Sequence, residues 1–163
     1  MIRDINYLIY HSTKKLEEVA GVYRAMQVTV GRHKPPQPFL IKPHMEKFVE
    51  WANNKEEQLH LVKLASEIHQ RFVTIHPFIN GNGRTARLLL NFQLTKTGFL
   101  PIYVKPNEKM RNAYNEAPYE TQKTPDASHE PFNQFIAKIV EETLHERIEV
   151  LKLNEQNLRD YDR

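Results

Sequence analysis

Apolar residues recur at spacings of three and four through most of the chain, which is the pattern of amphipathic helices. Met45, Phe48, Val49 and Ala52 share such a face, and Pro43 suits the first turn of their helix. The predicted helices cover residues 4–19, a segment that starts at Pro43, and residues 57–73, 82–97, 107–116 and about 131–157. The chain is therefore predicted to be mainly α-helical, with helices joined by short loops.

Three details of the pattern indicate how these helices pack and end. The apolar side of the first predicted helix is made of Ile5, Leu8, Ile9 and Leu16. Residues 88–90 are consecutive leucines, and because three consecutive residues cannot share one face, their helix is predicted to be buried on several sides. Gly98 follows that helix at the position of a C-cap glycine.

Residues 26–41 interrupt the helical pattern. The stretch 26–30 is prone to β-structure, Gly31 can turn, and the three prolines that follow oppose a helix. A short exposed hairpin or an extended flap is predicted. An exposed strand edge could pair with an extended segment of a target protein, and an ordinary surface hairpin is the alternative.

Bulk properties restrict the class of protein. A chain of 163 residues suits one domain, with a core expected over about 15–145 and a polar helical tail over about 146–163. The sequence has no cysteine, which excludes disulfides and thiolate metal sites. It shows no signal-peptide segment and no apolar run near the roughly 20 residues of a membrane span, so a cytoplasmic protein, or one delivered into a host cytosol, is expected without a membrane partner. The net charge of +3 is mild and no basic block stands out, so no nucleic-acid partner is expected.

The segment that carries chemistry is residues 76–87, His-Pro-Phe-Ile-Asn-Gly-Asn-Gly-Arg-Thr-Ala-Arg. Gly81 and Gly83 tolerate positive φ on either side of Asn82, and a predicted helix follows at once. Backbone N–H groups converge in such a turn and the helix N-terminus adds its dipole, so the turn favours an anion such as phosphate. The loop lacks the Lys-Ser/Thr ending of a Walker A motif.

The side chains around this loop suit a nucleotide and a proton transfer. Arg84 and Arg87 are three residues apart, so they lie on one helix face and present two guanidinium groups to a polyphosphate. An imidazole ordinarily titrates near neutral pH, so His76 is a candidate to take a proton from a hydroxyl. Asn80 offers an amide oxygen to a phosphate-bound magnesium, although a carboxylate is the usual ligand. Each feature alone is most often a plain turn or a solvated face, but together they indicate a nucleotide site.

At these residues the sequence resembles the Fic family signature, His-x-Phe-x-(Asp/Glu)-Gly-Asn-Gly-Arg-x-x-Arg, with Asn80 in place of the Asp or Glu. The similarity covers most of residues 15–140, including 21–28 and the glycine and prolines after them, which resemble the family's flap. It implies a mainly α fold, a Fic-type helical bundle with a short β-hairpin flap. It also implies a protein adenylyltransferase, which transfers AMP from ATP to a Tyr, Thr or Ser hydroxyl of a target protein.

The resemblance gives the loop residues their roles. His76 resembles the general base that deprotonates the target hydroxyl, whose oxygen then attacks the α-phosphate of ATP as pyrophosphate leaves. Gly81, Asn82 and Gly83 would form the anion hole around the phosphates. The flap of residues 26–41 would dock the target protein.

Other roles follow from the same resemblance. Arg84 and Arg87 would hold the β- and γ-phosphates and stabilise the leaving group. Phe78 is expected to point into the core and anchor the loop. Asn80 occupies the position of the Mg²⁺ ligand. Tyr114 falls where the family often packs a tyrosine near the adenine, and core packing is the alternative for it.

Two departures from the family pattern leave alternatives open. Asn80 removes a negative charge beside magnesium, so a weakly active nucleotide-binding or interaction module is one alternative. Another nucleotide donor or the removal of AMP on the same fold is a second. The sequence also shows no match to the family's inhibitory motif, (Ser/Thr)-x-x-x-Glu-(Gly/Asn), so we expect a constitutively open enzyme, inhibition by a partner protein, or a core cut from a longer protein.

Overall fold

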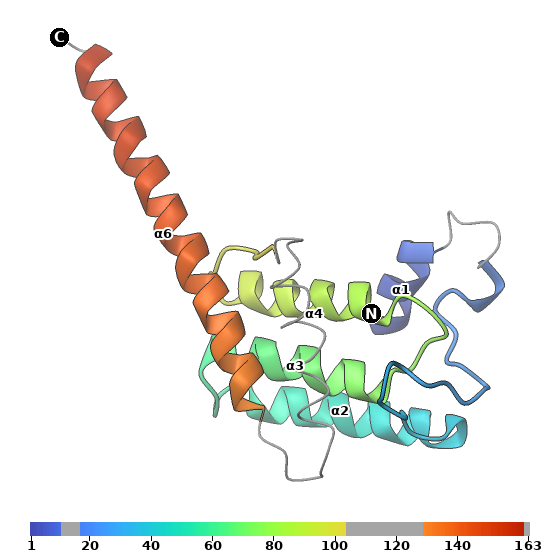
Figure 1. The fold of residues 1–163 in the computed structure, drawn as a ribbon. Coiled ribbons are helices and arrows are strands. Elements are labelled where there is room, and N and C mark those ends of the chain that lie inside the picture. The colour runs from blue at the N-terminus through green and yellow to red at the C-terminus, as the bar shows by residue number, and fades with distance from the viewer. Residues whose placement is uncertain (11–16, 104–128, 162–163) are drawn as a thin grey trace.

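The computed structural model describes residues 1–10, 17–103 and 129–161. Helices dominate this part of the chain (Figure 1): α1 (Ile2–Tyr10), η1 (Glu17–Val19), η2 (Pro38–Leu40), α2 (Ile41–Lys55), α3 (Leu61–Ile75), α4 (Asn82–Lys96) and α6 (Glu130–Tyr161). The mainly α-helical fold class is thereby confirmed. The helix predicted at 107–116, with Tyr114 and the loop after it, lies outside the described residues.

The central helix of the fold is α3. It packs against α2 on one side and α4 on the other, and the three run side by side in Figure 1. Helix α6 crosses the bundle at the end where α3 begins and α4 finishes, whereas α1 packs on α4 at the opposite end. The loop from α3 to α4, which contains the sequence motif, lies at this second end, beside α1.

Two apolar clusters hold these helices together, and α3 contributes to both. The first cluster, between α2, α3, α4 and the motif loop, contains Ile41, Met45, Phe48, Leu64, Ile68, Phe72, Ile75, Phe78, Ala86 and Leu89. The second cluster, between α3, α4 and α6, contains Val62, Ala65, Leu90, Leu94, Ile102, Phe132, Ile136, Ile139 and Val140. Each large side chain buried in this way contributes about 1.5–3 kcal/mol, so the clusters fix where the motif loop begins and ends.

Polar atoms and glycine conformation set the helix ends. His60 caps α3, because its Nδ1 accepts from the Val62 N–H at 3.3 Å. Gly98 has a φ of 87°, and after it the Phe99 N–H returns to the Leu94 carbonyl at 2.9 Å. The predicted C-cap glycine of α4 is therefore confirmed.

Helix α1 differs from the helix predicted over residues 4–19. It begins at Ile2 and ends at Tyr10, and residues 17–19 form the separate η1. The prediction that Leu8 faces the core is wrong, since its side chain is exposed whereas Asn6 and Tyr10 are buried. Two residues along a helix turn by about 200°, so a helix that buries Asn6 points Leu8 outward.

Helix α4 also corrects a prediction. Leu89 and Leu90 are buried, but Leu88 is 50% exposed, so the expected burial on several sides is wrong. Helices α3 and α1 cover α4 from one side, and successive residues lie about 100° apart. One of three consecutive leucines therefore faces outward.

The flap region contains less β-structure than predicted. Its hairpin is a single bridge in which Val30 and His33 exchange two N–H···O bonds of 2.9 Å across a turn with Gly31 at φ 58°. The expectation that the prolines oppose any helix fails at Pro38, which opens η2. Proline fits the first position of a helix because the N–H it lacks would have no helical partner there.

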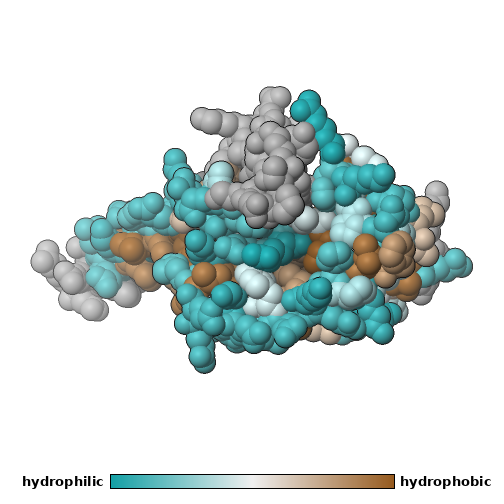
Figure 2. All heavy atoms as spheres, turned by 90° about the horizontal axis from the view of Figure 1, so that it is seen from below, coloured by the Kyte–Doolittle hydropathy of each residue, from teal (hydrophilic) through white to brown (hydrophobic). Residues whose placement is uncertain are grey.

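The C-terminal half of α6 extends away from the bundle (Figure 1). The tail predicted as polar is helical to Tyr161, yet it exposes Leu144, Ile148, Val150, Leu151 and Leu153. Seen from below, apolar surface shows on the side to which α6 projects (Figure 2). No helix among the described residues has the length and apolarity to cross a membrane.

Candidate active site

The motif loop starts where α3 stops at His76. The His76 N–H donates to the Phe72 carbonyl at 3.0 Å, and the residue then takes a left-handed conformation with φ 49° and ψ 58°. It is the only residue other than glycine with positive φ in the described part of the chain. The chain thus leaves the helix abruptly, and the imidazole lies at the end of a rigid element.

Phe78 anchors the middle of the loop, as predicted. Its side chain is fully buried and its ring lies 5.5 Å from that of Tyr23 and 6.2 Å from that of Phe72, centre to centre. An isolated β-bridge also joins Phe78 to Tyr23. These contacts fix the loop against both α3 and the segment that leads into the flap.

Asn82 closes the loop on itself. Its side-chain oxygen accepts from the Phe78 N–H at 3.0 Å, and its side-chain nitrogen donates to the Phe78 carbonyl at 2.8 Å. Because these two bonds occupy a buried side chain, only the backbone N–H of Asn82 is left to face an anion. The Asn82 side chain therefore holds the turn at the start of α4 together from the inside.

The backbone at the start of α4 leaves several N–H groups pointing out of the helix end. Gly81 is the N-cap residue with φ 82°, and the first intrahelical bond runs from the Thr85 N–H to the Gly81 carbonyl at 2.8 Å. The N–H groups of Asn82, Gly83 and Arg84 precede that bond, so they point out of the helix end together with its dipole. Such an end binds phosphate without further adaptation.

Helix α1 holds this turn in place through Asn6. The Asn6 side-chain nitrogen donates to the Asn80 carbonyl at 3.0 Å and to the Thr85 hydroxyl at 3.3 Å, while its oxygen accepts from the Gly21 N–H at 3.0 Å. The side chain is 1% exposed, so all three bonds are shielded from water. One amide thus joins α1, the anion-binding turn and the start of the flap segment.

The two motif arginines both lie at this end of α4. Arg84 donates to the Tyr10 hydroxyl, and its guanidinium carbon lies 4.4 Å from the centre of the Tyr10 ring. A Cβ added at Gly83 would lie 3.7 Å from Nη1 of Arg87, so the Arg87 guanidinium reaches back over the glycine turn. Both side chains are exposed at the surface and border the same N–H groups.

Burial determines the charge state of His76. Burial lowers the pKa of its imidazole to about 4, a hydrogen bond to the Val73 backbone opposes that change, and the charges of Arg24 and His33 add to it. The ring is therefore neutral at pH 7. Because the Val73 contact engages one ring nitrogen as a donor, the other carries the lone pair that a general base requires.

We expect the His76 ring to stay neutral down to about pH 5, which a ring ¹⁵N titration by NMR would show directly. The pKa is lower in the folded than in the unfolded chain, so the folded state binds fewer protons between about pH 4 and 6.5. Neutral His76 therefore contributes to the free energy of unfolding above pH 6.5, and this contribution is lost as the pH falls toward 4. A titration midpoint near pH 6.5 for the His76 ring in the native protein would contradict the expected low pKa.

The sequence profile of the Fic/DOC family matches residues 1–94, more than half of the chain. The chain belongs to the Fic/DOC family. The protein adenylyltransferase Fic of Nematostella vectensis is 40% identical over 129 residues, which cover 77% of this chain and 28% of that protein. The chain therefore spans little more than a quarter of that curated relative.

Solved structures show the same fold. A Fic-domain-containing signalling protein of Bacteroides thetaiotaomicron has a TM-score of 0.72 and 27% identity, over 85% of this chain and 57% of its own. The BepC protein of Bartonella tribocorum, with bound AMPPNP, has a TM-score of 0.63 and 16% identity, over 85% of this chain and 71% of its own. At that identity the second likeness concerns the fold alone.

The donor set of this Fic/DOC chain suits a metal that arrives with a nucleotide. Asn80 is exposed beside the anion-binding turn, and its backbone carbonyl is taken by Asn6, which leaves the side-chain amide oxygen available as one ligand. No group of three or more His, Asp or Glu side chains placed to hold a metal ion occurs in the part of the chain that the structure describes. Magnesium bound mainly by phosphates and water fits such a site.

Sequence reasoning missed two polar residues that shape this site. Asn6 occupies a position on the apolar face of α1, between Ile5 and Ile9, and a polar residue at such a position was the available signal. Arg24 is buried, with its guanidinium bonded to the His76 carbonyl at 2.9 Å. Its burial depends on segments distant in sequence, so no local pattern marks it.

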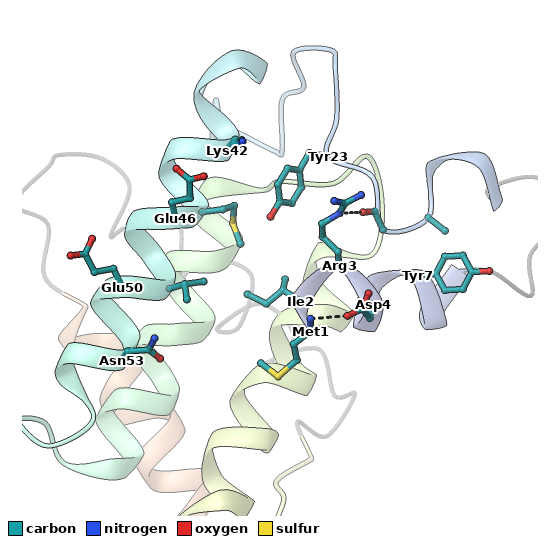
Figure 3. A pocket seen from close by; sticks show the side chains of 14 residues that line it. Met1, Ile2, Arg3, Asp4, Tyr7, Tyr23, Lys42, Glu46, Glu50 and Asn53 are labelled. Carbon is teal, nitrogen blue, oxygen red and sulfur yellow. Dashed lines mark hydrogen bonds and ion pairs between the residues drawn. The ribbon is translucent and has the colours of Figure 1, made fainter.

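A separate hollow of about 1190 Å³ lies between α1 and α2 (Figure 3). Apolar side chains such as Ile2, Met45 and Val49 line it, and charged groups including Lys42 and Glu46 stand around them. None of the predicted site residues lines this hollow. The chemical groups of the Fic/DOC motif therefore lie at the more open surface around the α4 N-terminus.

Proposed function

We propose that the chain is a protein adenylyltransferase that transfers AMP from ATP to a hydroxyl of a target protein. One observation carries this proposal: a neutral, partly buried imidazole at the end of α3 shares a short rigid loop with a helix N-terminus bordered by two arginines. The curated relative from Nematostella vectensis bears the name of this activity. ATP is the donor proposed because an adenylyl group comes from an adenine nucleotide and the two arginines suit its phosphates.

In the proposed mechanism His76 acts on the nucleophile. Its free ring nitrogen takes the proton of a Tyr, Thr or Ser hydroxyl, and the oxygen attacks the α-phosphorus of ATP. The bond from the α-phosphorus to the bridging oxygen breaks, and that oxygen leaves with pyrophosphate. The neutral imidazole is the required state, and its low pKa keeps it so throughout the physiological range.

The α4 end is proposed to receive the phosphates. The N–H groups of Asn82, Gly83 and Arg84 bind phosphate oxygens, and the guanidinium groups of Arg84 and Arg87 neutralise the charge that develops on pyrophosphate. In the free protein Arg84 is bonded to Tyr10. Its guanidinium therefore rests beside the site before the nucleotide arrives, so little reorganisation is needed.

The target protein is proposed to bind at the flap. The Val30–His33 bridge closes the flap, and Nε2 of His33 ties the flap to the site, since it lies 2.9 Å from the carbonyl of Thr74, two residues before His76. Met26 and Val30 are exposed there, so an extended target segment could pack on their side chains and pair with backbone groups of the residues between them. An inhibitory partner protein would bind over the same surface.

Asn80→Asp is expected to transfer AMP as fast as the wild type or faster, at a lower magnesium concentration. A carboxylate binds Mg²⁺ better than an amide, and Asn80 is exposed, so the extra charge has little burial cost. Transfer measured against magnesium concentration checks this. Asn54→Asp on exposed α2 surface is the matched control, and a collapse of transfer in Asn80→Asp alone would show that the amide has a specific role.

The function is tested by incubating the chain with ATP labelled at the α-phosphate, Mg²⁺ and a protein extract. The proposal predicts label that stays on protein after denaturation and does not appear when label is at the γ-phosphate. Bound ATP without protein labelling would favour the alternative that Asn80 suggests, a weakly active nucleotide-binding module. Labelling from another nucleotide in preference to ATP would keep the reaction class and replace the donor, and loss of label from previously modified protein would indicate AMP removal.

A further inference from the structure

Arg24 makes three hydrogen bonds from one buried guanidinium. Its Nε donates to the His76 carbonyl at 2.9 Å, its Nη1 to the Met26 carbonyl at 2.9 Å and its Nη2 to the Pro36 carbonyl at 2.6 Å. The residue is 3% exposed. Since all three acceptors are backbone atoms, the group fixes chain positions and not particular side chains.

The three acceptors belong to two different parts of the proposed site. Met26 and Pro36 lie on the two limbs of the flap, on either side of the Val30–His33 bridge. His76 is the proposed base, and its carbonyl belongs to the left-handed residue that ends α3. One guanidinium therefore contacts both limbs of the flap, where the target is proposed to dock. It also contacts the backbone of His76, which is proposed to take the proton of the target hydroxyl.

Among the described residues, the charge of Arg24 has no acidic counterpart. No ion pair between Arg24 and a carboxylate occurs among the described residues, and burial alone lowers the pKa of its guanidinium. A buried cation is costly unless hydrogen bonds replace its water. Carbonyl groups from both segments supply that replacement, so moving either segment away would leave a buried charge poorly solvated.

A short polar side chain or a lysine could not replace this contact. The guanidinium is planar and directs its donors in a fixed fork, whereas the lysine ammonium is a compact point charge. The backbone of Arg24 adds a further tie, because its N–H donates to the Pro77 carbonyl at 2.9 Å. Replacing Arg24 by lysine keeps this backbone hydrogen bond. The effect of the variant therefore reports the side chain alone.

We infer that Arg24 is a positioning residue that holds the flap and the backbone of His76 in a fixed relation, so that a target bound at the flap presents its hydroxyl to the imidazole. The inference rests on the proposed function for its consequence. The structural coupling between flap and loop can be measured without any transfer. Arg24 does not touch the phosphate-binding end of α4, so nucleotide binding is independent of it.

The kinetic test compares Arg24→Lys with Gln27→Ala. Gln27 braces the flap internally, by bonds of 3.2 Å to the Val28 carbonyl and 2.8 Å to the Pro35 carbonyl, and does not touch His76. With Mg·ATP and a protein extract, Arg24→Lys should lower the maximal rate of label transfer about 10- to 100-fold. It should also raise the extract concentration at which transfer reaches half of its maximal rate. The KM for ATP should change by less than about twofold, since ground-state nucleotide binding is untouched.

The structural test measures amide hydrogen exchange in the free protein, in the flap and in residues 76–80. Arg24→Lys should speed exchange in both segments together, whereas Gln27→Ala should affect the flap alone. A second variant, Pro36→Gly, makes the backbone at one of the three acceptors more flexible and leaves Arg24 in place. It tests the same coupling if Arg24→Lys fails to fold. It should also speed exchange in both segments.

The outcomes separate the two proposals. If the wild type labels no protein but Arg24→Lys speeds amide exchange in both segments, the proposed function is wrong and the structural coupling is supported. A change confined to one segment in both Arg24→Lys and Pro36→Gly would overturn the inference. Normal rate and normal extract dependence in a folded Arg24→Lys variant would overturn it as well.

Discussion

His76→Ala is expected to lower AMP transfer by about 10²- to 10⁴-fold, the usual contribution of a general base. The imidazole is neutral and held at the end of α3, so alanine removes the proton acceptor and nothing that binds phosphate. The affinity for ATP should therefore stay within about twofold of the wild type. Transfer of α-phosphate label and calorimetric ATP binding, measured on the same preparations, check both halves of the prediction.

The matched control for this variant is His44→Ala. His44 is exposed on α2, away from the motif loop, and its replacement should change neither transfer nor binding. Alanine keeps the backbone bond from residue 76 to the Phe72 carbonyl, so both variants are expected to stay folded. Thermal unfolding of both variants checks this. Equal transfer by His76→Ala and the wild type would assign the proton to another group.

Gly81→Ala is expected to abolish both nucleotide binding and transfer, with a loss of transfer of at least about 10²-fold. A Cβ at Gly81 would overlap Cε2 of Tyr10 and lie 2.7 Å from Nδ2 of Asn6, and the residue has a φ of 82°. Relieving the clash requires α1 to move or the N-cap turn to change shape. Either response misaligns the N–H groups that are proposed to bind phosphate.

Two other glycines supply controls for this prediction. Gly98 has a φ of 87° but open space around it, so Gly98→Ala carries the backbone strain alone and should keep ATP affinity. A Cβ at Gly83 would meet Arg87 at an ordinary 3.7 Å, so Gly83→Ala should fold normally and report contact with the phosphates. Isothermal titration with ATP and thermal unfolding of all three variants separate strain from clash. Similar ATP affinities in Gly81→Ala and Gly98→Ala would show that the α1 contact is unimportant.

The helices and the chemical groups of the site were predictable because their signals are local. Residue spacing along α2 placed the buried Met45 and Phe48 correctly, and Phe78 is anchored in the core as the motif implies. The prediction that Val49 shares this buried face is wrong, since Val49 is 42% exposed. The turn at the start of α4 involves only consecutive residues, so the glycines around Asn82 indicated a tight turn before a helix, and its binding of an anion stays a prediction. Gly98 at the end of α4 is a signal of the same kind.

The contacts that hold the site together were not predictable, because they join distant positions. Asn6 and Asn80 are 74 positions apart, and Arg24 and His76 are 52 apart. No periodicity in one segment reports the partner that another segment supplies. The inward turn of the Asn82 side chain was missed for a related reason, since it depends on an irregular loop returning to Phe78. Tyr114 stays a prediction, as it lies outside the described residues.

The account depends on a nucleotide's phosphates lying against the start of α4, next to His76. Amide ¹⁵N NMR during titration with magnesium and an ATP analogue that cannot be hydrolysed tests this most directly. We predict the largest shifts at Asn82, Gly83 and Arg84, with smaller shifts at His76 and its neighbours. Shifts centred instead on the α1–α2 hollow of Figure 3, with the α4 end unchanged, would contradict the account.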